Sequence, residues 1–494
     1  MKHLTKPPES VEKTPWMSIV IVTAMAIFTS IQSGLYYSSM WPYLQKIDVD
    51  ATESFLGAII SIYSFGQIIA SPLVGWYSNY LGTIKVPVSI CICLQILGNL
   101  IYFYAQAAPT HWGKYIMMLA RFVLGLGSSN LALLNTYACT ASTPRYKSRT
   151  IALVTGGIAL GISLGPGIQL FFLPLGKDGI KIAENLYLNL YTAPAVGACV
   201  VNVCALSCLL CLFDESYAGT LPQPKTALTD KPKRKLRIDW IALILCHVVG
   251  FVHYCTFTNV ETLGTTFAMT MMGFTEEKAI SFTSIAFTAL SLVELVFYLV
   301  YIVFKLERWG STRCQCLLGL MGLLLFYTAT FSWPFLPGEL AVHTEREFID
   351  YHNHLSNISE PVGCNIDRFS WCFDIKPISP YLYLTTLAIV VGLSFGIINT
   401  TLSTLFSEVL GPKKQGTQQG FFHMTKCSAR MVGPMAITFL YRGFGPRIAW
   451  SLQLSMLGGT ILLYLAFYKR MIPMQYPAVN KIQPEDHQIT TKQV

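Results

Sequence analysis

Charged side chains inside long apolar stretches are the residues of this chain that could do chemistry. One stretch carries Lys426 and Arg430 at a spacing of four, with His423 and Cys427 on the same helical face. An ionisable side chain at the centre of a bilayer costs about 2.5–3.5 kcal/mol on insertion scales, so such residues persist where they are paired or face water or a ligand. A buried basic stripe would attract an anion, or a carboxylate from a neighbouring helix.

Other apolar stretches contribute single charges. Arg121 has small residues on its own helical face, Glu294 lies deep in its stretch, and Glu261 lies near the end of its stretch. The basic residues are predicted to line a central cavity, with the two glutamates as counter-ions or protonatable relays. The full set predicted to line an ion or substrate pathway is Arg121, Lys426, Arg430, Glu294, Glu261, Gln67 and Tyr36.

A static pair between Arg430 and Glu294 that only locks helix packing is the alternative interpretation. The pathway is favoured because a buried ion pair contributes little net stability. The histidines of these stretches, His247, His253 and His423, are better explained as hydrogen-bond donors satisfied within their own helix than as proton carriers.

The sequence contains no enzyme motif of the types G-x-S-x-G, Walker loop or H-E-x-x-H. The pairs Cys91/Cys93 and Cys314/Cys316 lie within or beside apolar stretches and lack metal-ligand spacing. We therefore expect no enzyme, no bound metal and no cofactor.

The composition indicates that membrane helices hold these charges. Of the 494 residues, 53% are hydrophobic and 12% are charged. Soluble domains carry about 25% charged residues, so a water-soluble fold is excluded, as is a disordered chain. Apolar runs suited to spans of roughly 20 residues occur near residues 16–40, 55–78, 86–108, 115–141, 151–173, 191–213, 240–264, 279–304, 314–333, 381–405, 421–441 and 450–468.

The net charge of +9 reflects membrane topology rather than a nucleic-acid surface. With a cytosolic N-terminus, the cytosolic segments hold more than twice as many Lys and Arg residues as the opposite side, as the positive-inside rule requires. Both termini are therefore predicted in the cytosol. The predicted parts are a cytosolic N-tail (1–15), a six-helix half (16–213), a basic cytosolic linker (214–239), a second six-helix half (240–468) with a luminal loop (334–380), and a cytosolic C-tail (469–494).

Recurring motifs indicate that the two halves are copies of one another. The pairs that recur in the same order are Gly82…Lys85 and Gly310…Arg313, Pro144-Arg145 and Pro412-Lys413, and Gly165-Pro166 and Gly433-Pro434. One insertion separates the matches, and the long polar stretch after Trp333 can supply it. The predicted fold class is an all-α membrane protein with twelve transmembrane helices in two pseudo-symmetric six-helix halves.

These patterns resemble the major facilitator superfamily. That family carries a G-x-x-x-D-R-x-G-R/K-R/K loop between its second and third helices, and its fourth helix has the pattern R-x-x-x-G-x-G. The matching residues here are Gly75, Asn79, Gly82 and Lys85 in the first half, Glu307, Arg308 and Gly310 in the second, and Arg121, Gly125 and Gly127 in the fourth span. The first-half copy lacks the acid and the first base. The resemblance implies a cavity between two halves.

More distinctive strings are Trp41-Pro42-Tyr43-Leu44-Gln45-Lys46-Ile47-Asp48, Ser54-Phe55-Leu56-Gly57, Ala70-Ser71-Pro72, Gly363-Cys364 with Trp371-Cys372, Gly411-Pro412-Lys413 with Gln415-Gly416, and Ala429-Arg430 with Gly433-Pro434. They resemble the lysosomal branch of the superfamily that is linked to late-infantile neuronal ceroid lipofuscinosis, from the first span through the twelfth. This resemblance implies a late endosomal or lysosomal location and the permeation of anions, notably chloride.

A further set of residues is predicted to act in helix packing and gating. Glycines at i+4 spacing in the fifth span predict close helix packing, and the following proline adds a bend. Glu408 is predicted either to pair with Arg308 or Arg313 at the cytosolic end or to be solvated. The set is Gly75, Gly82, Lys85, Gly157, Gly161, Gly165, Pro166, Glu307, Arg308, Gly310, Glu408, Gly433 and Pro434.

The luminal loop and the C-tail carry candidate modification and sorting sites. Asn357 begins a glycosylation sequon. Cys364 and Cys372 are the only cysteines predicted on the luminal side, which indicates a disulfide. Tyr476 and Val479 form a Tyr-x-x-apolar pattern of the kind that sorting adaptors read.

The sequence thus predicts a multi-pass transporter of small, chloride-like anions in an endolysosomal membrane. Its expected partners are membrane lipid, the small anion or solute, and a sorting adaptor at the C-tail, without nucleic acid. One alternative is a proton-coupled carrier of a small organic solute, with Glu294 as the proton site. The other is a non-transporting membrane receptor or scaffold.

Overall fold

Long apolar helices make up most of the chain. The computed structural model describes residues 14–36, 39–48, 51, 53–109, 112–176, 179–183, 186–218, 238–352, 361–412, 414–472 and 474. Within that part, 11 helices are long and apolar enough to cross a membrane. The last of them, α15 (Gly416–Ala466), has a non-helical residue at Gly445 with φ 83° and ψ 175°. Its 51 residues therefore form two consecutive spans, because one span needs only about 20.

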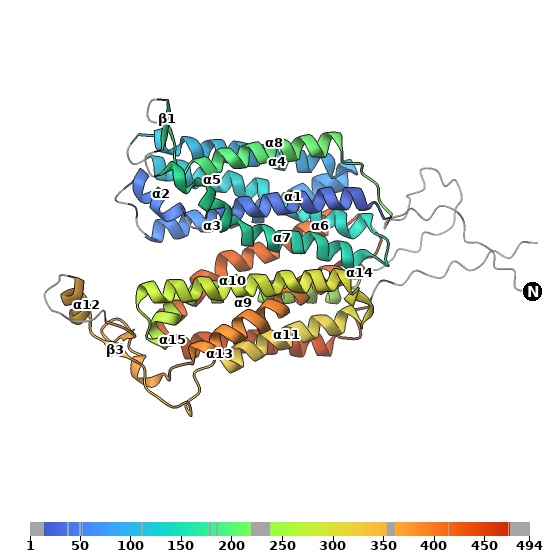
Figure 1. Ribbon diagram of the computed structural model, residues 1–494. Coiled ribbons are helices and arrows are strands. Elements are labelled where there is room, and N and C mark those ends of the chain that lie inside the picture. Colours follow the sequence, from blue (N-terminus) through green and yellow to red (C-terminus); the bar gives the residue numbers. More distant parts are fainter. Residues whose placement is uncertain are drawn as a thin grey trace, which may run out of the picture.

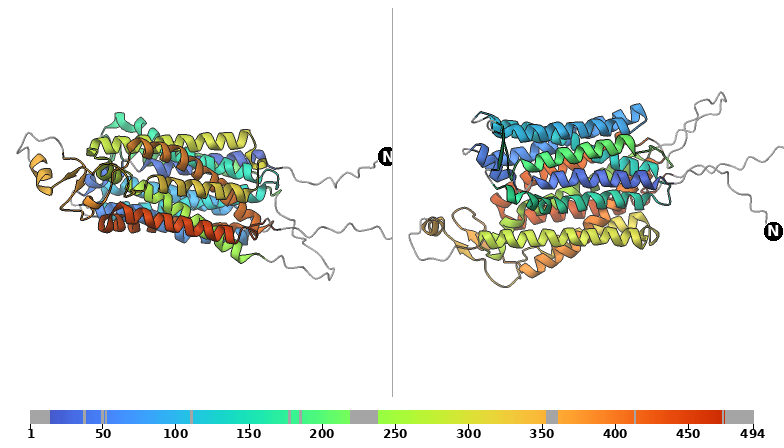
Figure 2. Two further views of the ribbon diagram at one scale, coloured as in Figure 1. Left: turned by 90° about the horizontal axis from the view of Figure 1, so that it is seen from below. Right: turned by 45° about the horizontal axis from the view of Figure 1, so that its top comes forward.

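The helices form two layers, and the early and late parts of the chain separate into them (Figure 1). The first layer contains α1 (Trp16–Leu35), α3 (Glu53–Leu81), α4 (Lys85–Tyr104), α5 (Gly113–Ser128), α6 (Asn130–Ala141), α7 (Lys147–Gln169) and α8 (Ala193–Cys211). The second contains α9 (Trp240–Met272), α10 (Glu276–Val303), α11 (Thr312–Ala329), α13 (Pro380–Thr385), α14 (Gly392–Leu410) and α15. Two further views show the long helices running side by side (Figure 2).

Two predicted spans are interrupted helices. The fourth span divides at Ser129 into α5 and α6, and the tenth passes from α13 through a π-helical turn, Thr386–Val391, into α14. Short elements join the spans: α2 (Met40–Ile47), the antiparallel pair β1 (Ile180–Ala183) and β2 (Leu186–Leu188), the parallel pair β3 (Val342–His343) and β4 (Cys364–Asn365), and α12 (Glu345–His352).

Local sequence explains several helix boundaries. The Asp239 carboxylate accepts hydrogen bonds from the backbone nitrogens of Ile241 and Ala242 at the start of α9, at 3.0 and 3.3 Å. Such caps satisfy amide groups that a helix start leaves without partners. Gly273 ends the same helix with φ 64°, a left-handed conformation that favours glycine.

Glycines lie where the first and fifth helices of each half cross, with backbone contact in the first half and side-chain contact in the second. A Cβ on Gly161 of α7 would lie 2.5 Å from the carbonyl oxygen of Ile27 on α1, and one on Gly165 would lie 2.7 Å from Gly34. In the other half, a Cβ on Gly433 of α15 would lie 2.9 Å from Oδ1 of Asn259 on α9. The recurring glycine motif thus marks the same helix crossing in both halves.

The loop after α11 is attached to the break in α15. A disulfide joins Cys364 and Cys372, as their isolation in the sequence predicts. Trp371 packs edge-on against Tyr441 at 5.4 Å between ring centroids, and Arg447 donates hydrogen bonds to the carbonyl oxygens of Ser332 and Asp374. The predicted sequon at Asn357 lies outside the described residues.

Replacing Cys364 and Cys372 by serine is expected to loosen this loop. Closing so short a loop contributes about 2–3 kcal/mol through the entropy of the unfolded chain. Limited proteolysis of the purified protein should cut residues 334–380 faster in the double variant, and added reductant should accelerate cutting of the wild type alone. The matched control is Cys316→Ser, a buried free cysteine on α11. Equal cutting rates in both proteins would contradict the prediction.

Candidate functional site

The two halves touch at one end of the bundle. We call the end where α1 begins and α15 ends the termini end, and the opposite end, with residues 334–380, the loop end (Figure 1). Several hydrogen bonds join the halves within the described ranges, toward the termini end. These bonds join Ser71 to His423, Cys427 to Gln67, Asn79 to Gly416 and Thr417, Lys414 to Asn79, Ser148 to Thr404, and Gln419 to Cys139.

Backbone contact seals the α3–α15 side of this closure. A Cβ on Gly75 would lie 2.3 Å from the carbonyl oxygen of Gly416, and a Cβ on Gly420 would lie 2.3 Å from the carbonyl oxygen of Ser71. Real Cβ atoms do not approach other atoms so closely, so both positions require glycine while the end is closed. Gly75, which the family motif singles out, therefore belongs to the contact between halves.

Aromatic side chains seal the α7–α10 side. The ring of Tyr298 covers Gly156, where a Cβ would lie 3.0 Å from the ring. Tyr298, Phe297 and Tyr301 form a buried cluster with Ala152 of α7. The two contacts between the halves are thus of different character: small residues on one side and large rings on the other.

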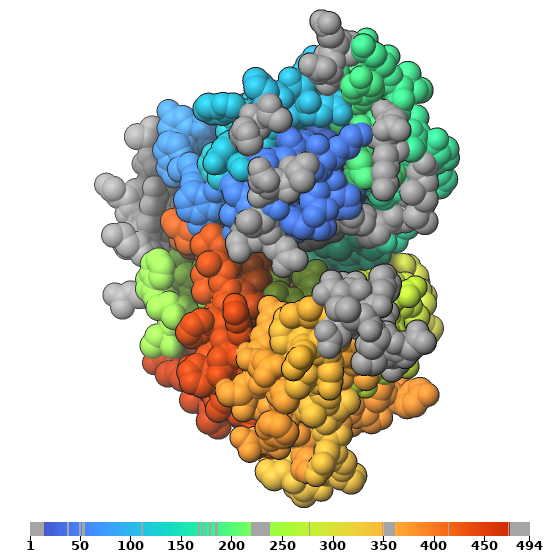
Figure 3. Space-filling model, turned by 90° about the vertical axis from the view of Figure 1, so that its left-hand side faces the viewer, coloured from blue at the N-terminus to red at the C-terminus, as the bar shows by residue number. Residues whose placement is uncertain are grey.

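The loop end is open between the halves. There the outer parts of α9 and α10 present exposed polar side chains, among them Glu261, Thr262, Thr266, Ser281 and Ser284. A view of the molecule from the loop end shows two lobes with a hollow between them (Figure 3). The hollow between the halves therefore lies at the loop end, whereas the halves are in contact at the termini end.

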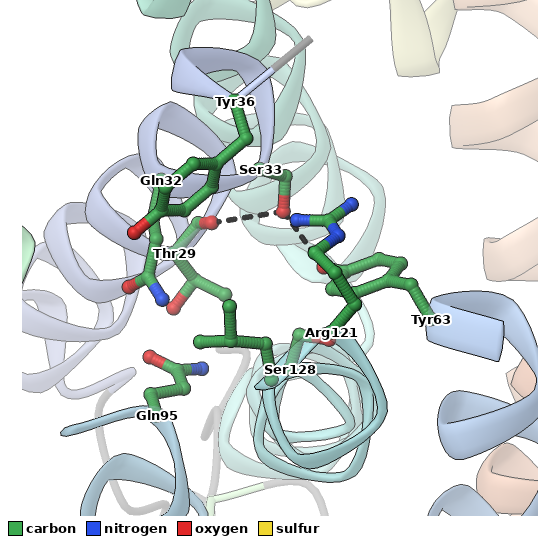
Figure 4. A pocket seen from close by; sticks show the side chains of 9 residues that line it. Thr29, Gln32, Ser33, Tyr36, Tyr63, Gln95, Arg121 and Ser128 are labelled. Atoms are coloured by element: carbon green, nitrogen blue, oxygen red, sulfur yellow. Dashed lines mark hydrogen bonds between the residues drawn. The ribbon is translucent and has the colours of Figure 1, made fainter. Parts of the chain in front are cut away.

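Arg121 of α5 occupies a small pocket in the first half. Its side chain is only 2% exposed, and its guanidinium lies 4.5 Å from the ring centre of Tyr63 and 5.6 Å from that of Tyr36. Ser33 and Tyr63 share a hydrogen bond of 2.8 Å, and Tyr36 donates one to Asn99. The pocket lining is Thr29, Gln32, Ser33, Tyr36, Tyr63, Gln95, Arg121, Leu124 and Ser128 (Figure 4).

Two donors in this pocket are buried without a partner among the described residues. They are Nε of Arg121 and Nε2 of Gln95, and the acceptor Oε1 of Gln95 is likewise without a partner there. Buried polar groups are almost always satisfied in native proteins, so an exception calls for a ligand, water or a functional role. One cation and two unused donors make a site suited to a small anion or a carboxylate.

The basic stripe of α15 lies across the cavity region from this pocket. Lys426 Nζ lies 4.3 Å from the ring centre of Phe422 and 5.4 Å from that of Tyr254. Arg430, one helical turn further on, is half-buried, and its charge acts on Glu261 and Tyr254 of α9. The structure therefore brings Lys426, Arg430 and Glu261 into one region of the second half.

Glu294 is held on its own helix. It is 6% exposed and accepts a hydrogen bond of 3.1 Å from Tyr298, four residues further on in α10. This hydrogen bond lies within α10, and the static Arg430–Glu294 pair considered above stays an alternative interpretation. Tyr298 connects Glu294 to the α7–α10 closure.

The histidines differ in their surroundings. His247 Nδ1 lies 2.8 Å from Oγ1 of Thr425, and His423 Nδ1 lies 3.0 Å from Oγ of Ser71, so each has a hydrogen-bond partner. His253 is fully buried, and neither ring nitrogen has a partner among the described residues; its ring packs on Phe395 at 4.4 Å. Two of the three histidines thus have a hydrogen-bond partner, which in each case lies on another helix.

Asn79 occupies the position where the family motif has an acid, and it still binds the opposite half. Its Oδ1 accepts a hydrogen bond of 3.0 Å from the backbone nitrogen of Gly416, and its Nδ2 donates to Thr417 at 2.8 Å. It therefore caps the first turn of α15. The absence of an acid from the motif gave no sign of this contact in the sequence. An amide oxygen accepts hydrogen bonds from the backbone N–H groups at a helix start, as a carboxylate does.

Lys85 binds within the first half, whereas Gly82 faces the second half, since Nζ of Lys414 would lie 3.2 Å from a Cβ there. Gly82 has φ 73° in the turn after α3, and Lys85 Nζ donates to the carbonyl oxygen of Leu210 at 2.9 Å. Glu215, which the sequence did not single out, accepts from the backbone of Ile84 at 2.7 Å and from Tyr217. Burial, together with the Glu215 carboxylate, raises the pKa of Tyr217 well above its usual value, so its hydroxyl stays a donor.

The second-half copy of the motif makes fewer contacts. Gly310 has φ 131°, and Oε2 of Glu307 is buried with no hydrogen-bond partner in the described part of the chain. Arg313 donates to the carbonyl oxygen of Tyr468, and among the described residues no ion pair joins Glu408 to Arg308 or Arg313. Of the two alternatives for Glu408, a pair with one of these arginines or solvation, the described contacts show no pair. Pro166 and Pro434 lie within helices α7 and α15.

Replacing Asn79 by alanine is expected to weaken closure of the termini end by about 1 kcal/mol, the usual value of a helix cap. The measurement is labelling of Cys139, which is buried at this closure beside Gln419, by a membrane-impermeant thiol reagent. Labelling should accelerate in Asn79→Ala and stay near the wild-type rate in Asn79→Asp, which keeps the acceptor. An unchanged rate in the alanine variant would mean that the cap does not hold the end closed.

Comparison with known proteins agrees with this architecture. The sequence model of the Major Facilitator Superfamily matches residues 20–342. Major facilitator superfamily domain-containing protein 8 of Xenopus laevis is 28% identical over 481 residues, covering 93% of this chain and 92% of that protein. The resemblance drawn from sequence motifs is thereby confirmed.

Solved structures share the fold at low identity. The human organic anion transporter MFSD10 (TETRAN) superposes with a TM-score of 0.62 at 14% identity, over 93% of this chain and 100% of that chain. The E. coli fucose:proton symporter FucP superposes with a TM-score of 0.64 at 12% identity, over 92% and 99% of the two chains. With the sequence match covering more than half of its length and the two-layer helical fold in agreement, this chain is a member of the major facilitator superfamily of membrane transporters.

Proposed function

We propose that this protein moves small, chloride-like anions across an endolysosomal membrane through the cavity between its halves. The observation that carries the proposal is the Arg121 pocket, where Nε of the buried Arg121 cation and Nε2 of Gln95 lack hydrogen-bond partners among the described residues. Lys426 and Arg430 add positive charge on the opposite half. The name of human MFSD10, an organic anion transporter, gives related support for an anionic substrate.

The proposed transport cycle alternates which end of the bundle is open. With the loop end open, an anion enters the cavity and meets Arg121 on one side and the α15 stripe on the other. Separation of the α3–α15 and α7–α10 contacts then opens the termini end while the loop end closes. No group changes its covalent chemistry; the basic side chains lower the electrostatic cost of an anion at membrane depth.

The orientation in the membrane is also a proposal. Both termini and the linker 214–239 lie in the cytosol, and the loop 334–380 lies in the lumen. The positive-inside bias supports this placement, and so does the Cys364–Cys372 disulfide, since disulfides persist in oxidising compartments. The candidate sorting signal at Tyr476 and Val479 lies outside the described residues and remains a proposal, as does glycosylation at Asn357.

The test is chloride flux into vesicles that contain the purified protein. Wild-type protein should carry chloride down an imposed gradient, and Arg430→Ala should lose most of that flux. Arg442→Ala, which removes an exposed arginine near the loop-end turn of α15, is the matched control and should keep it. Equal flux in wild type and Arg430→Ala would exclude the basic residues as the anion pathway.

A proton-coupled carrier of a small organic solute is the second candidate. The observation that favours it is the Tyr298–Glu294 hydrogen bond, since a proton on Glu294 would change a contact that reaches the α7–α10 closure. Glu294→Gln should then abolish pH-driven uptake, whereas chloride conduction that ignores a pH gradient supports the first candidate. A receptor or scaffold would keep its function in both Arg430→Ala and Glu294→Gln.

A further inference from the structure

One buried amide lies between the Arg121 pocket and the second half. Gln67 belongs to α3 and is 2% exposed, and both ends of its amide have a partner. Its Nε2 donates a hydrogen bond of 3.1 Å to Oγ of Ser128 on α5, and its Oε1 accepts one of 3.3 Å from Sγ of Cys427 on α15. The two partners lie in different halves, so the side chain of Gln67 bridges them.

Ser128 is the end of this bridge that meets the pocket. It is one of the residues that line the pocket around Arg121 (Figure 4). Its hydroxyl oxygen accepts from Gln67, and its hydrogen is donated to the carbonyl oxygen of Gly125, 3.1 Å away in the same helix. Hydrogen bonds to a charged acceptor are roughly twice as strong as bonds to a neutral one. An anion beside Ser128 would therefore draw the hydroxyl hydrogen away from Gly125 and into the pocket.

The direction of the Ser128 hydroxyl decides how the amide of Gln67 is held. A hydroxyl both donates and accepts, so with the pocket empty Ser128 can meet either end of the amide. Once its hydrogen points to an anion, Ser128 can only accept, and Gln67 must present Nε2 to it and Oε1 to Cys427. Neighbouring hydrogen bonds also polarise one another, which strengthens the bond from Gln67 to a hydroxyl that donates to an anion.

Cys427 is the end of the bridge that belongs to the contact between the halves. It is 2% exposed, and its Sγ lies 3.5 Å from Nδ1 of His423, four residues earlier in α15. The same nitrogen lies 3.0 Å from Oγ of Ser71, which donates to the backbone carbonyl oxygen of Gln67 at 2.6 Å. Gln67 is thus connected to the second half through its side chain and through its backbone, on the side where α3 and α15 close the termini end.

We infer that Gln67 links occupancy of the Arg121 pocket to closure of the termini end: an anion in the pocket strengthens the Ser128–Gln67–Cys427 bridge, and an empty pocket weakens it. Gln67 is a positioning residue, since it does not itself line the pocket. Anion binding and closure then favour each other by the same factor, as two coupled equilibria must. The inference rests on the proposed anion transport and adds to it the residues that connect the pocket with the closure.

The test is labelling of Cys139, which is buried at the closure, by a membrane-impermeant thiol reagent in vesicles that contain the purified protein. The rate is compared in sodium chloride and in sodium gluconate, whose anion is much larger, at equal ionic strength. Chloride should slow wild-type labelling by roughly fivefold, the lower range of coupling between two sites. Gln67→Leu, Ser128→Ala and Cys427→Ala should each label at one rate in both salts. Cys427→Ser, which keeps a donor for Oε1, should keep the chloride effect.

Ser148→Ala is the matched control, because it removes a hydrogen bond of 3.3 Å between the halves, to Thr404, that does not reach the pocket. It should label faster than the wild type in both salts and keep the chloride effect, which separates lost coupling from a weaker closure. A chloride effect that persists in Gln67→Leu, or no effect in a wild type that carries chloride, overturns the inference and leaves the proposed function standing. A wild type that carries no chloride overturns the proposed function and the inference with it.

Discussion

Gly420→Val is expected to prevent the termini end from closing and to abolish transport. A Cβ at this position would lie 2.3 Å from the carbonyl oxygen of Ser71 and 3.0 Å from Cα of Pro72, both backbone atoms of α3. Backbone cannot move aside as the end of a flexible side chain can, so the two helices must separate. Overpacking typically costs about 1–3 kcal/mol, which corresponds to a shift of roughly 5–150-fold in the balance between closed and open ends.

Two measurements check this prediction. The rate at which a membrane-impermeant thiol reagent labels Cys139 should rise, since Cys139 is buried at the closure, and chloride flux in vesicles should fall, because the cycle requires both ends to close in turn. Gly458→Val is the matched control: it lies in the second span of α15, and nothing stands within 4 Å of where its Cβ would be. Wild-type labelling and flux in a folded Gly420→Val protein would contradict the closure described above.

The spans were predictable because a bilayer imposes a length and a composition on every helix that crosses it. All twelve expected runs correspond to helical segments. The last two follow one another in α15, with a break at Gly445. The break at Ser129 and the π turn within the tenth span were not predictable, since neither changes the apolar pattern. Short elements outside the membrane, such as the hairpin β1–β2, were not predictable either, because the bilayer imposes no length or composition on them.

The charges of the site were predictable, but their partners were not. Arg121, Glu294 and Lys426 stand out in sequence because the membrane makes a charge costly. Gln95 does not, because an amide in a helix looks the same whether it bonds within its helix or faces a pocket. Which ring lies beside Arg121 depends on the neighbours of α5, and the sequence of one helix does not contain that information.

The contact of Asn79 shows a second limit of sequence reasoning. The family pattern places an acid there, and its absence suggested a lost charge contact. The structure shows that the useful feature is an oxygen that accepts from the first turn of α15, which asparagine also provides. A motif position that usually carries a charged side chain can therefore keep its contact through a neutral hydrogen-bond acceptor.

Arg121→Gln is expected to remove most anion flux while leaving the protein folded. The guanidinium is the buried cation of its pocket, and hydrogen bonds to charged groups contribute about 1.5–3 kcal/mol, so flux should fall by a factor on the order of ten to one hundred. Chloride flux in vesicles measures this effect. Arg442→Gln, which removes an exposed arginine near the loop end, is the matched control and should keep wild-type flux.

Arg121→Lys separates charge from shape. Lysine keeps the positive charge but loses the planar group that lies 4.5 Å over the Tyr63 ring, and arginine and lysine are not equivalent at stacked sites. Flux should therefore be intermediate between the wild type and Arg121→Gln. If charge alone mattered, the lysine variant would match the wild type; if only packing mattered, both variants would lose flux equally.

Thermal stability provides the decisive comparison for Arg121. A residue kept for stability should lower the melting temperature when it is replaced, whereas Arg121 Nε is buried without a partner in the described part of the chain. Removing a buried charge of that kind relieves a desolvation cost. We therefore expect Arg121→Gln to melt at the wild-type temperature or above it while its flux is lost. A lower melting temperature with unchanged flux per folded protein would assign Arg121 to the fold and not to the anion pathway.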